Sequence, residues 1–544
     1  MNIKLKIESL IEEKKFTEAR NLILENENDF KDDPEFYCMK AVIELLEENL
    51  DKAQDILNQG LMINPVHFDL LYNLAYVYKI KNDYLAAIDC YEKALINTTL
   101  PEMKELILNE LESVQYDINE LVEAQSKDPL VSIVLLAYNK LEYTQLCIES
   151  ILKYTSQVNY ELITVNNGSS DGTLEFFESI PNAKVVNLKE NVGPVNGFNA
   201  GILEAKGKYT ACVCNDFIFT PNWLDNILKC IESDETIGFV SPGASNVGNY
   251  QNIKGEYNNI GEMLEFAEKY NVSDPSKWEE RVRLLPCVLL VRTNLLKEIG
   301  MYDPRFYFGE FADDDISFRI RRSGYKILFC KDTFTFHFGS VTTGEDQLNN
   351  NSLQVSREIF KEKYGLDAWY DAGFNIEMIN ASVDLVKSDQ TDNYRILGIN
   401  TKCGGNPLQL KNYLREKGIS NISITNFCLD SKYKIDLDTV SDSVVEGTLF
   451  EITNLLNSHT QDFIILELQL DLLDQSPELI SDIFQLLEED GNFALSLETK
   501  HLKENELKKL LLKIESYGLR IEFQKIIPNS INGQDVILVG KRGS

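Results

Sequence analysis

The chain has 544 residues, 44% of them hydrophobic, and a formal net charge of −33 at pH 7. This length fits three or four domains of ordinary size, and the negative charge argues against nucleic acid and anionic lipid as partners. The ten cysteines are scattered without a C-x-x-C pair, which is typical of a reducing compartment, so we expect a cytoplasmic protein.

The N-terminal residues MNIKLKIESLIEEKKF are amphipathic and charged, without the apolar core of a signal peptide. No later run approaches the roughly 20 apolar residues that a membrane helix needs. We therefore expect no integral membrane segment.

Small residues recur every 34 positions in the first 125 residues. Ala19, Ala53 and Ala87 follow this period, as do Ala41 with Ala75 and Gly60 with Ala94. Such spacing lets paired helices approach closely and resembles tetratricopeptide repeats. The clearest copy is LYNLAYVYKIKNDYLAAIDCYEKAL. We predict an all-α repeat domain over residues 1–125, ending in a capping helix over 103–125, that presents or selects a protein acceptor or another macromolecule.

Three ordered segments follow between residues 131 and 201: VSIVLLAYN, ELITVNNGSSDGT and NVGPVNGFNAG. The first two begin with apolar runs dense enough for buried strands and end on polar residues. Ligands of open α/β sheets bind outside the carboxyl ends of the strands, where these polar residues would lie. The order and spacing of the segments resemble an inverting family 2 glycosyltransferase with a GT-A fold. We therefore expect a Rossmann-like α/β catalytic domain over residues 128–385.

The resemblance implies a nucleotide-sugar donor and places its binding residues at the ends of these segments and of the next strand. They are Ala137, Tyr138, Asn139, Asn166, Asn167, Asn191, Gly193, Asn215 and Asp216. Asn166 stands where relatives commonly carry the Asp that meets the base, and its side-chain carbonyl can accept a hydrogen bond from a pyrimidine N3–H. Asp171 is predicted instead to cap the helix that begins near Thr173.

A metal site is implied by the segment KGKYTACVCNDFIFTPNWL, where a buried strand from Tyr209 to Cys214 leads to Asp216. Asp216 matches the family's carboxylate that binds a divalent ion bridging the two phosphates, and Mn²⁺ or Mg²⁺ suits such oxygen ligands. The sequence departs from the family at Cys214, where an acidic residue is usual. His337, in FTFHFGSV, stands where many relatives place a further metal ligand; the alternative is an ordinary core or loop histidine.

The acidic segment MYDPRFYFGEFADDDISFRIRRSGYKI resembles the family's catalytic-base segment. The alignment places Asp313 at the base and Ala312 where Glu is usual, and Glu310 is the alternative base. The base would take the proton of the acceptor hydroxyl in a single displacement with inversion. Adjacent carboxylates also suit the start of a helix, and we predict that Asp315 pairs with Arg319 at i,i+4.

From about Tyr394 to Arg542, apolar strands alternate with helices: RILGIN, ISITNF, DFIILEL, GNFALSLE, LRIEFQKI and DVILVGK. This order resembles a nucleotide-fold methyltransferase, so we expect a second Rossmann-like domain over 390–544. Its glycine loop, however, reads INTKCGGN, with Asn400 and Lys402 in place of two glycines, and Asn426 replaces the acid that would bind ribose. We expect a non-catalytic domain for packing or partner binding, with an active methyltransferase as the alternative.

Taken together, these features predict a metal-dependent inverting glycosyltransferase. Among proteins with this combination of domains, it is similar to bacterial enzymes that modify protein hydroxyls, including those of flagellin. UDP-N-acetylglucosamine is the first expected donor and a dTDP-deoxysugar such as dTDP-rhamnose the second. The alternatives are a cell-surface polysaccharide glycosyltransferase and a catalytically silent scaffold, the latter suggested by Cys214 and Ala312.

Overall fold

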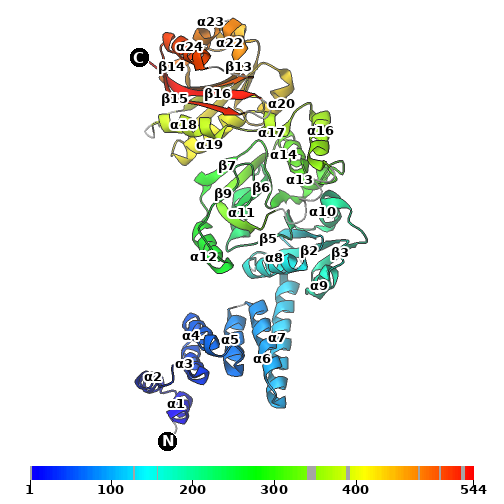
Figure 1. Ribbon diagram of the computed structural model, residues 1–544. Coiled ribbons are helices and arrows are strands. Elements are labelled where there is room, and N and C mark those ends of the chain that lie inside the picture. Colours follow the sequence, from blue (N-terminus) through cyan, green and yellow to red (C-terminus); the bar gives the residue numbers. More distant parts are fainter. Residues whose placement is uncertain are drawn as a thin grey trace. The chain divides into compact units, whose positions relative to one another are not determined.

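A computed structural model of the protein describes residues 3–27, 29–81, 83–125, 129–155, 157–339, 351–387, 393–475, 478–500, 504–528 and 533–543. The chain forms two compact units, 1–127 and 128–544 (Figure 1). Among the described residues, no helix is both long and apolar enough to cross a membrane. The predicted order of one helical region followed by two α/β regions is confirmed at the level of secondary structure.

The first unit is entirely helical in its described part. Its helices are α1 (Ile3–Glu12), α2 (Phe16–Glu25), α3 (Pro34–Leu46), α4 (Leu50–Ile63), α5 (Phe68–Ile80), α6 (Tyr84–Asn97) and α7 (Pro101–Gln125). Consecutive helices pack as the hairpins α1/α2, α3/α4 and α5/α6, and α7 packs on α6. Ala19, Ala53 and Ala87 are fully buried. A Cβ atom at Gly60 would lie 2.7 Å from Leu70 Cδ1, so the 34-residue period places small residues where helices meet.

The second unit begins with a mixed sheet in the order β3-β2-β1-β4-β8-β6-β9-β5, and β7 pairs with β9. The strands are β1 (Val131–Ala137), β2 (Tyr160–Asn167), β3 (Lys184–Leu188), β4 (Tyr209–Cys214), β5 (Phe217–Ile218), β6 (Ile237–Ala244), β7 (Trp278–Glu280), β8 (Leu289–Arg292) and β9 (Lys326–His337). Strands β3, β2, β1 and β4 are parallel, while β8 is antiparallel to β4 and β6. The four parallel strands therefore end at one edge of the sheet.

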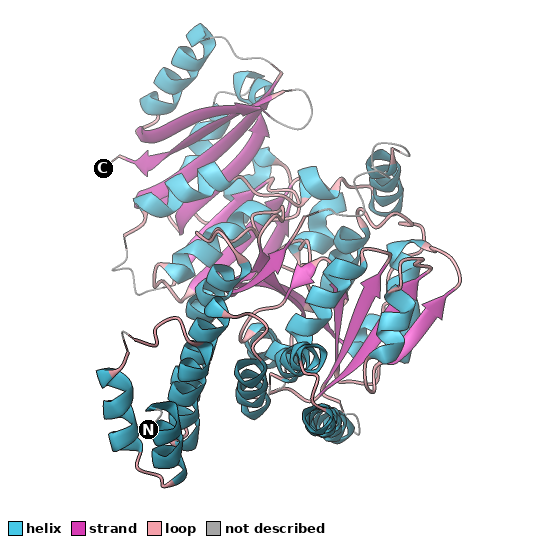
Figure 2. Ribbon diagram, turned by 60° about the horizontal axis from the view of Figure 1, so that its bottom comes forward, coloured by secondary structure: helices cyan, strands magenta, loops and turns pink. Residues whose placement is uncertain are grey.

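Helices cover both faces of this first sheet (Figure 2). The helices of this part are α8 (Leu141–Tyr154), α9 (Thr173–Ser179), α10 (Gly193–Glu204), α11 (Trp223–Glu232), α12 (Ile260–Tyr270), η1 (Pro275–Lys277), α13 (Thr293–Glu298), α14 (Ala312–Arg322), α16 (Ser352–Tyr364) and α17 (Ala368–Asp371). Along β1, Ile133 and Leu135 enter the core that contains α8 and α11, while Val134 and Leu136 enter the core that contains α10 and α14. A strand that is buried on both faces has apolar residues at consecutive positions, which explains the sequence VSIVLLA of β1.

A second sheet has the order β12-β11-β10-β13-β14-β16-β15. Its strands are β10 (Tyr394–Ile399), β11 (Ile422–Cys428), β12 (Ser443–Glu446), β13 (Gln461–Gln469), β14 (Leu487–Thr499), β15 (Leu519–Pro528) and β16 (Gln534–Arg542). All pairs are parallel except those made by β16, which is antiparallel to β14 and β15. The sheet is therefore of the open α/β kind that the alternating pattern predicted.

Helices and short turns connect the strands of the second sheet. They are α18 (Ile376–Leu385), α19 (Gly405–Glu416), η2 (Ser431–Tyr433), α20 (Lys434–Leu437), η3 (Leu449–Glu451), α21 (Ile452–Leu455), α22 (Leu470–Gln475), α23 (Glu478–Phe484) and α24 (Glu504–Ser516). Helix α18 packs against α19, β14 and β16. The elements around the second sheet thus include α18, which lies before residue 390, the predicted start of the second Rossmann-like domain.

A buried ionic contact joins helix α14 of the first sheet to α20 of the second. Asp436 is fully buried, and its carboxylate accepts hydrogen bonds from Arg321 at 3.1 Å and Arg322 at 2.6 Å. On another side, Gln409 of α19 donates to the buried carboxylate of Glu279 on β7 at 2.9 Å. Removing one partner of such a pair leaves an uncompensated buried charge, so these contacts hold the two sheets together.

Candidate active site

Polar residues follow β1, β2 and β4 at one edge of the first sheet. Ala137 lies opposite Asn166 on β2, and Leu136 lies opposite Cys214 on β4. Parallel strands present their carboxyl ends at the same edge, so the donor-binding residues expected after these strands lie close together. Ala137 is buried, whereas the Tyr138 side chain is 38% exposed, which leaves the tyrosine ring available to a ligand.

Asn139 connects the loops that follow the three strands. Its backbone has φ +54°, a left-handed conformation that Asn tolerates. Its N–H donates to Ser169 Oγ at 2.8 Å, and its side-chain oxygen accepts from the Ser170 N–H at 2.9 Å. Its carbonyl oxygen accepts from Asn215 Nδ2 at 3.2 Å, and the same amide donates to Thr144 Oγ1 at 2.9 Å. Asn139 and Asn215 therefore fix the shape of this edge.

Asn166 is buried, with 2% of its surface exposed. Its amide donates to Asn187 Oδ1 at 2.8 Å, and its carbonyl oxygen accepts from the Ser169 N–H at 3.0 Å. One of the two lone pairs of the oxygen expected to meet the nucleotide base is thus occupied within the protein. Asn166 therefore also shapes the turn, and its contact with the base stays a prediction.

Asn167 and Asn191 hold the loop that leads into α10. Asn167 donates to Asn191 Oδ1 at 3.0 Å and accepts from the Val192 N–H at 3.0 Å, while Asn191 Oδ1 accepts from the Gly193 N–H at 2.9 Å. Gly193 has φ +80°, and a Cβ atom there would lie 2.5 Å from the Tyr307 carbonyl oxygen. Glycine is needed at this position for both its conformation and its size.

The predicted metal ligands, Asp216 and His337, are brought together where the short strand β5 pairs with the end of β9. Strand β5 pairs with the end of β9 so that Phe217 lies opposite His337, and the Phe338 N–H donates to the Asp216 carbonyl oxygen at 3.1 Å. The His337 ring stacks on the Phe217 ring, with centroids 4.4 Å apart. His337 Nε2 then lies 3.2 Å from Asp216 Oδ2, although 121 residues separate the two in the chain.

Both ring nitrogens of His337 face acceptors. Nδ1 lies 3.3 Å from the carbonyl oxygen of Asn246, and Nε2 lies 3.2 Å from Asp216 Oδ2. With a proton on Nδ1, that proton is donated to Asn246 and the lone pair of Nε2 faces Asp216. Metal-binding histidines are commonly oriented by such a hydrogen bond from the other ring nitrogen, so this is the tautomer in which His337 and Asp216 would share a cation.

The two side chains fit a divalent cation of the expected size. Ligand atoms about 2.1 Å from a six-coordinate ion and at right angles to each other lie about 3.0 Å apart, close to the observed 3.2 Å. The described part of the chain holds no group of three or more His, Cys, Asp or Glu placed to bind a metal. Asp216 and His337 would therefore supply two ligands, and diphosphate oxygens and water would supply the others.

Two of the three aspartates that begin α14 are engaged in ion pairs. Asp314 accepts from Arg283 Nη1 at 2.9 Å and from Trp369 Nε1 at 3.2 Å. Asp315 accepts from Arg319 Nε at 2.8 Å, which confirms the predicted i,i+4 pair.

Asp315 is also bonded by two residues of α16. Lys363 Nζ and the Tyr364 hydroxyl both donate to its Oδ1, the hydroxyl at 2.7 Å. Asp315 is fully buried, so these contacts compensate its charge. Both Asp314 and Asp315 therefore hold α14 in place.

Asp313 differs from its two neighbours because no described residue donates a hydrogen bond to its side chain. It is close enough to Cys214, Cys287 and Tyr302 to raise the pKa of each of them. Burial among these weakly polar groups, and then the charge of Asp314, raise the pKa of Asp313 to about 8. A carboxylate with a raised pKa and an open proton-accepting position is suited to act as a general base.

Glu310, the alternative base, lies two residues before α14. Its Oε1 accepts from the Ser352 hydroxyl at 2.6 Å, and its Oε2 is buried without a partner among the described residues. One oxygen is thus committed to the buried Ser352, whereas both oxygens of Asp313 are open. The geometry favours Asp313 over Glu310.

Cys214, at the position where relatives carry an acidic residue, lies close to both Asp216 and Asp313. The thiol is exposed to solvent, yet surrounding protein atoms and then these two carboxylates raise its pKa well above the usual value. A neutral thiol at this position adds no negative charge between the proposed metal ligand and the proposed base.

Sequence reasoning did not identify the residues that orient the proposed ligands. Ser245 accepts from the His337 N–H at 2.9 Å, and the Asn246 side chain donates to the His337 carbonyl oxygen at 2.9 Å. Both follow the apolar strand β6 in the sequence IGFVSPGASN, so polar residues at a strand's carboxyl end were an available signal. Trp369 donates a hydrogen bond to Asp314, which lies 55 residues earlier in the chain. Nothing in the sequence near Trp369 indicates this contact.

Comparison with known proteins identifies two regions of the chain. Residues 132–278 match Glycosyl transferase family 2, and residues 68–95 match the Tetratricopeptide repeat. Over 113 residues the chain is 36% identical to an uncharacterized glycosyltransferase of Haemophilus influenzae, covering 20% of this chain and 35% of that protein. Over 259 residues it is 24% identical to Glycosyltransferase AglE of Haloferax volcanii, and the match covers 45% of this chain and 81% of that protein.

Among solved structures, the chain is similar to GalNAc-T7 crystallised with UDP, GalNAc and Mn²⁺, at 16% identity and a TM-score of 0.32, over 38% of this chain and 43% of that one. The match to the Haemophilus protein spans only about a third of that protein's length. The sequence matches confirm a tetratricopeptide repeat at residues 68–95 and the glycosyltransferase assignment at residues 132–278. The chain therefore carries a glycosyltransferase domain of family 2, matched over residues 132–278, and a tetratricopeptide repeat before it.

Proposed function

We propose that this protein is a metal-dependent, inverting glycosyltransferase that moves a sugar from a nucleotide to a hydroxyl of a macromolecule. The observation that carries the proposal is the pairing of Asp216, which lies within the matched family 2 region, with His337, 3.2 Å away. The carboxylate of Asp313, which is free of described partners, supplies the other group that the reaction needs. The catalytically silent scaffold is disfavoured because a non-catalytic protein has no need of this arrangement.

In the proposed mechanism, Asp216 Oδ2 and His337 Nε2 would hold a divalent cation, Mn²⁺ or Mg²⁺. When bound, the cation would neutralise charge on the departing diphosphate. Asp313 takes the proton of the acceptor hydroxyl as its oxygen attacks the anomeric carbon opposite the diphosphate. One C–O bond forms while the bond to the diphosphate breaks, so the configuration at the anomeric carbon inverts without a sugar–enzyme intermediate.

The nucleotide is proposed to bind along the edge formed by Ala137, Tyr138 and Asn139, with Asn215 beside Asp216. Tyr138 offers an exposed aromatic face for a base. UDP-N-acetylglucosamine is the first proposed donor and a dTDP-deoxysugar the second. Incubating the protein with each donor and Mn²⁺, and measuring release of the nucleoside diphosphate, tests the proposal; the absence of turnover with every donor would favour the scaffold.

The pH dependence of the reaction should reflect the ionisation of the Asp313 carboxyl group. The general base must be ionised, and the pKa of Asp313 is raised to about 8. Below that pH the ionised fraction falls about tenfold per pH unit. We expect kcat/KM, measured at saturating Mn²⁺, to rise with pH and to level off above about 8, because kcat/KM reports the free enzyme. A profile that is flat between pH 6 and pH 9 would contradict the assignment.

The helical repeats are proposed to bind the acceptor, which we propose to be a protein such as flagellin. Stacked helical hairpins form concave surfaces suited to segments of a partner. A chain that begins at Ser126 removes the first unit as a whole, so we expect it to keep donor hydrolysis and to lose transfer to a protein acceptor, chiefly through a higher acceptor KM. If the shortened chain modifies the protein acceptor as efficiently as the full chain, the repeats do not select it.

The C-terminal region is proposed to be a non-catalytic relative of the methyltransferases. Asn400 and Lys402 occupy left-handed conformations, with φ +57° and +52°, where glycine would be unstrained. Asn426, in place of the ribose-binding acid, is fully buried and accepts from Thr401 Oγ1 at 2.7 Å. The Lys402 ammonium lies 4.0 Å from Glu467. These side chains occupy the loop that would otherwise approach S-adenosylmethionine.

A further inference from the structure

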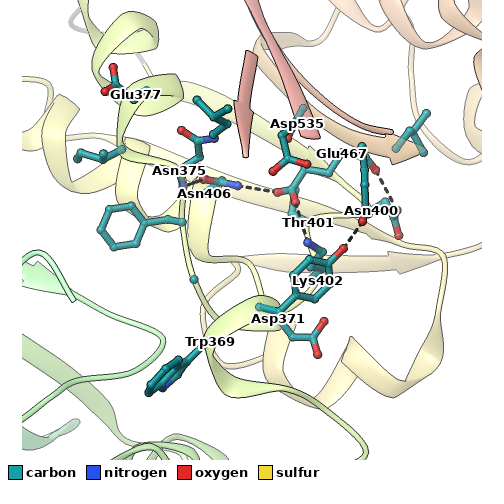
Figure 3. Close-up of a pocket in the computed structure, with 18 of the residues that line it drawn as sticks. Trp369, Asp371, Asn375, Glu377, Asn400, Thr401, Lys402, Asn406, Glu467 and Asp535 are labelled. Atoms are coloured by element: carbon teal, nitrogen blue, oxygen red, sulfur yellow. Dashed lines mark hydrogen bonds and ion pairs between the residues drawn. The ribbon is translucent and has the colours of Figure 1, made fainter. Parts of the chain in front are cut away.

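A cavity lies at the carboxyl edge of the second sheet. Its volume is about 610 Å³, within the roughly 300–1,000 Å³ of small-molecule sites. Its walls come from the loop after β10, the ends of β13 and β14, and helix α17 (Figure 3). Strand β10 has β11 on one side and β13 on the other, and the crevice at such a point of reversal is where open α/β sheets bind ligands.

The charge of the lining excludes anionic ligands. Among the described lining residues, six are acidic and one is basic: Asp371, Glu377, Asp430, Glu467, Glu498 and Asp535, against Lys402. The Lys402 ammonium is already engaged, 3.6 Å from the centre of the Tyr370 ring and 4.0 Å from Glu467 Oε2. A phosphate group would therefore meet an excess of negative charge with no uncommitted cation on the described wall.

The polar groups of the cavity are mostly acceptors. Figure 3 shows Glu467 between Asn406 and Lys402, with Asp535 nearby. Glu467 Oε1 accepts from Asn406 Nδ2 at 2.8 Å, and an ionised carboxylate has further lone pairs. Burial raises the pKa of Glu467, so a donor from a ligand would offset part of the cost of its charge. A ligand that suits these groups must supply several hydrogen-bond donors.

Aromatic rings form another part of the lining. They belong to Tyr250, Trp369, Tyr370, Phe374 and Tyr433. Tyr250 and Trp369 are 53% and 43% exposed. One face of the Trp369 ring is covered by Phe311, with centroids 4.9 Å apart, and Tyr250 packs beside Phe374, so each ring offers a ligand only the part that these contacts leave exposed. A flat apolar surface combined with acceptors suits a molecule that has one C–H face and several hydroxyl groups. Sugar rings have this character.

We propose that the cavity is a saccharide site, which binds a sugar through its hydroxyl groups and through stacking and which rejects sugar phosphates. The tethered ammonium of Lys402 already fills the cation position beside Tyr370 and Glu467, so the ligand needs no positive charge of its own. The proposal rests on the cavity alone and does not depend on the proposed transfer reaction.

Trp369 provides an intrinsic signal for binding. It lines the cavity and is 43% exposed, whereas Trp223 is fully buried and Trp278 is 8% exposed. A sugar that stacks on Trp369 should change the fluorescence of the full-length protein, and Trp369→Phe should lose that change. The Trp369 indole N–H also bonds to Asp314, so its ring is held at the cavity wall.

The test compares neutral sugars with the same sugars carrying a 6-phosphate group. Glucose, galactose, mannose and N-acetylglucosamine are titrated into the full-length protein, each beside its own 6-phosphate, with saturation-transfer NMR and tryptophan fluorescence as readouts. We expect at least one neutral sugar to bind and its 6-phosphate to bind at least about tenfold more weakly, the size typical of one unmet contact to a charged group. Mn²⁺ with UDP should not displace it, which separates this cavity from the proposed active site.

Two variants locate the bound sugar. Ser496, on the cavity wall, is changed to Phe to fill the space, and Glu467→Gln removes the charge at constant size. Both should weaken binding at least about tenfold, while Glu446→Gln, an exposed carboxylate at the end of β12, should not. If Ser496→Phe lowers the melting temperature of the protein, the location of the bound sugar is judged from the binding of Glu467→Gln alone.

Two outcomes would overturn the proposal. One is that none of the sugars binds, and the other is that the 6-phosphates bind as tightly as the neutral sugars. In the first case, binding of S-adenosylmethionine would assign the cavity to a nucleoside cofactor. Failure of donor turnover at the first sheet would leave the saccharide proposal unaffected, because none of these measurements uses transfer activity.

Discussion

Asp216→Ala is expected to abolish metal-dependent turnover of the donor while leaving the protein folded. The carboxylate is one of two protein groups that face each other at 3.2 Å, and a metal ion that stabilises a leaving diphosphate contributes several kcal/mol, which corresponds to a loss of at least about 10²-fold. Release of nucleoside diphosphate, with saturating Mn²⁺ or with EDTA, measures the effect. Binding of Mn²⁺ and UDP should raise the melting temperature of the unchanged protein and not that of the variant.

The matched control is Glu235→Ala, which removes an exposed carboxylate after α11. It should keep both the turnover and the metal-induced rise in melting temperature. His337→Ala should resemble Asp216→Ala, since both side chains would hold the same ion. Full turnover in EDTA, or unchanged turnover in Asp216→Ala, would exclude the metal site proposed here.

Asp313→Asn is expected to reduce sugar transfer by about 10²–10⁴-fold, the contribution typical of a general base, with donor binding unchanged. The substitution keeps the shape of the side chain and removes its affinity for a proton. Because no described residue hydrogen-bonds to this carboxylate, the variant should break no contact that holds α14. The measurements are kcat for transfer and the dissociation constant of the donor.

Glu310→Gln separates the two candidate bases. Glu310 is bonded to Ser352 at 2.6 Å, so we expect its variant to affect stability more than the chemical step. If Glu310→Gln loses transfer while Asp313→Asn keeps it, the role of base moves to Glu310. Asp314→Asn serves as a further comparison, because it removes a carboxylate that pairs with Arg283 and Trp369 and should lower the melting temperature.

Much of the fold follows from patterns that act over short distances in the chain. The 34-residue period, the apolar runs of β1 and β4 and the alternation after Tyr394 each specify an element and its buried face. Local hydrogen bonds were partly predictable. Asp315 pairs with Arg319 as expected. Asp171 accepts from the Thr173 N–H at 3.2 Å, but Gly172 and not Asp171 holds the N-cap position of α9.

Contacts between distant parts of the chain were less predictable. Nothing near Asn166 in the sequence shows that its carbonyl oxygen is taken by Ser169, and nothing near Asp314 reveals its bond with Trp369. The contact of Arg321 and Arg322 with Asp436 joins segments more than 110 residues apart. Such contacts depend on how two sheets pack, which a pattern within one element does not contain.

The cavity at the second sheet was also not predictable from sequence patterns. The substitutions Asn400 and Lys402 suggested only that a cofactor loop had been lost. The structure shows that aromatic residues before β10 and carboxylates at the ends of β13 and β14 line a cavity beside that loop. A loop that departs from a family's cofactor motif is therefore compatible with a new ligand site.

The stereochemistry of the product tests the central claim most directly. The protein is incubated with Mn²⁺ and a sugar nucleotide of known anomeric configuration, and the first product, with a hydroxyl acceptor or with water, is examined by NMR before the anomers equilibrate. The proposed single displacement, with Asp313 as base and Asp216 and His337 at the diphosphate, predicts a product of the opposite configuration. A product that retains the configuration of the donor would contradict it.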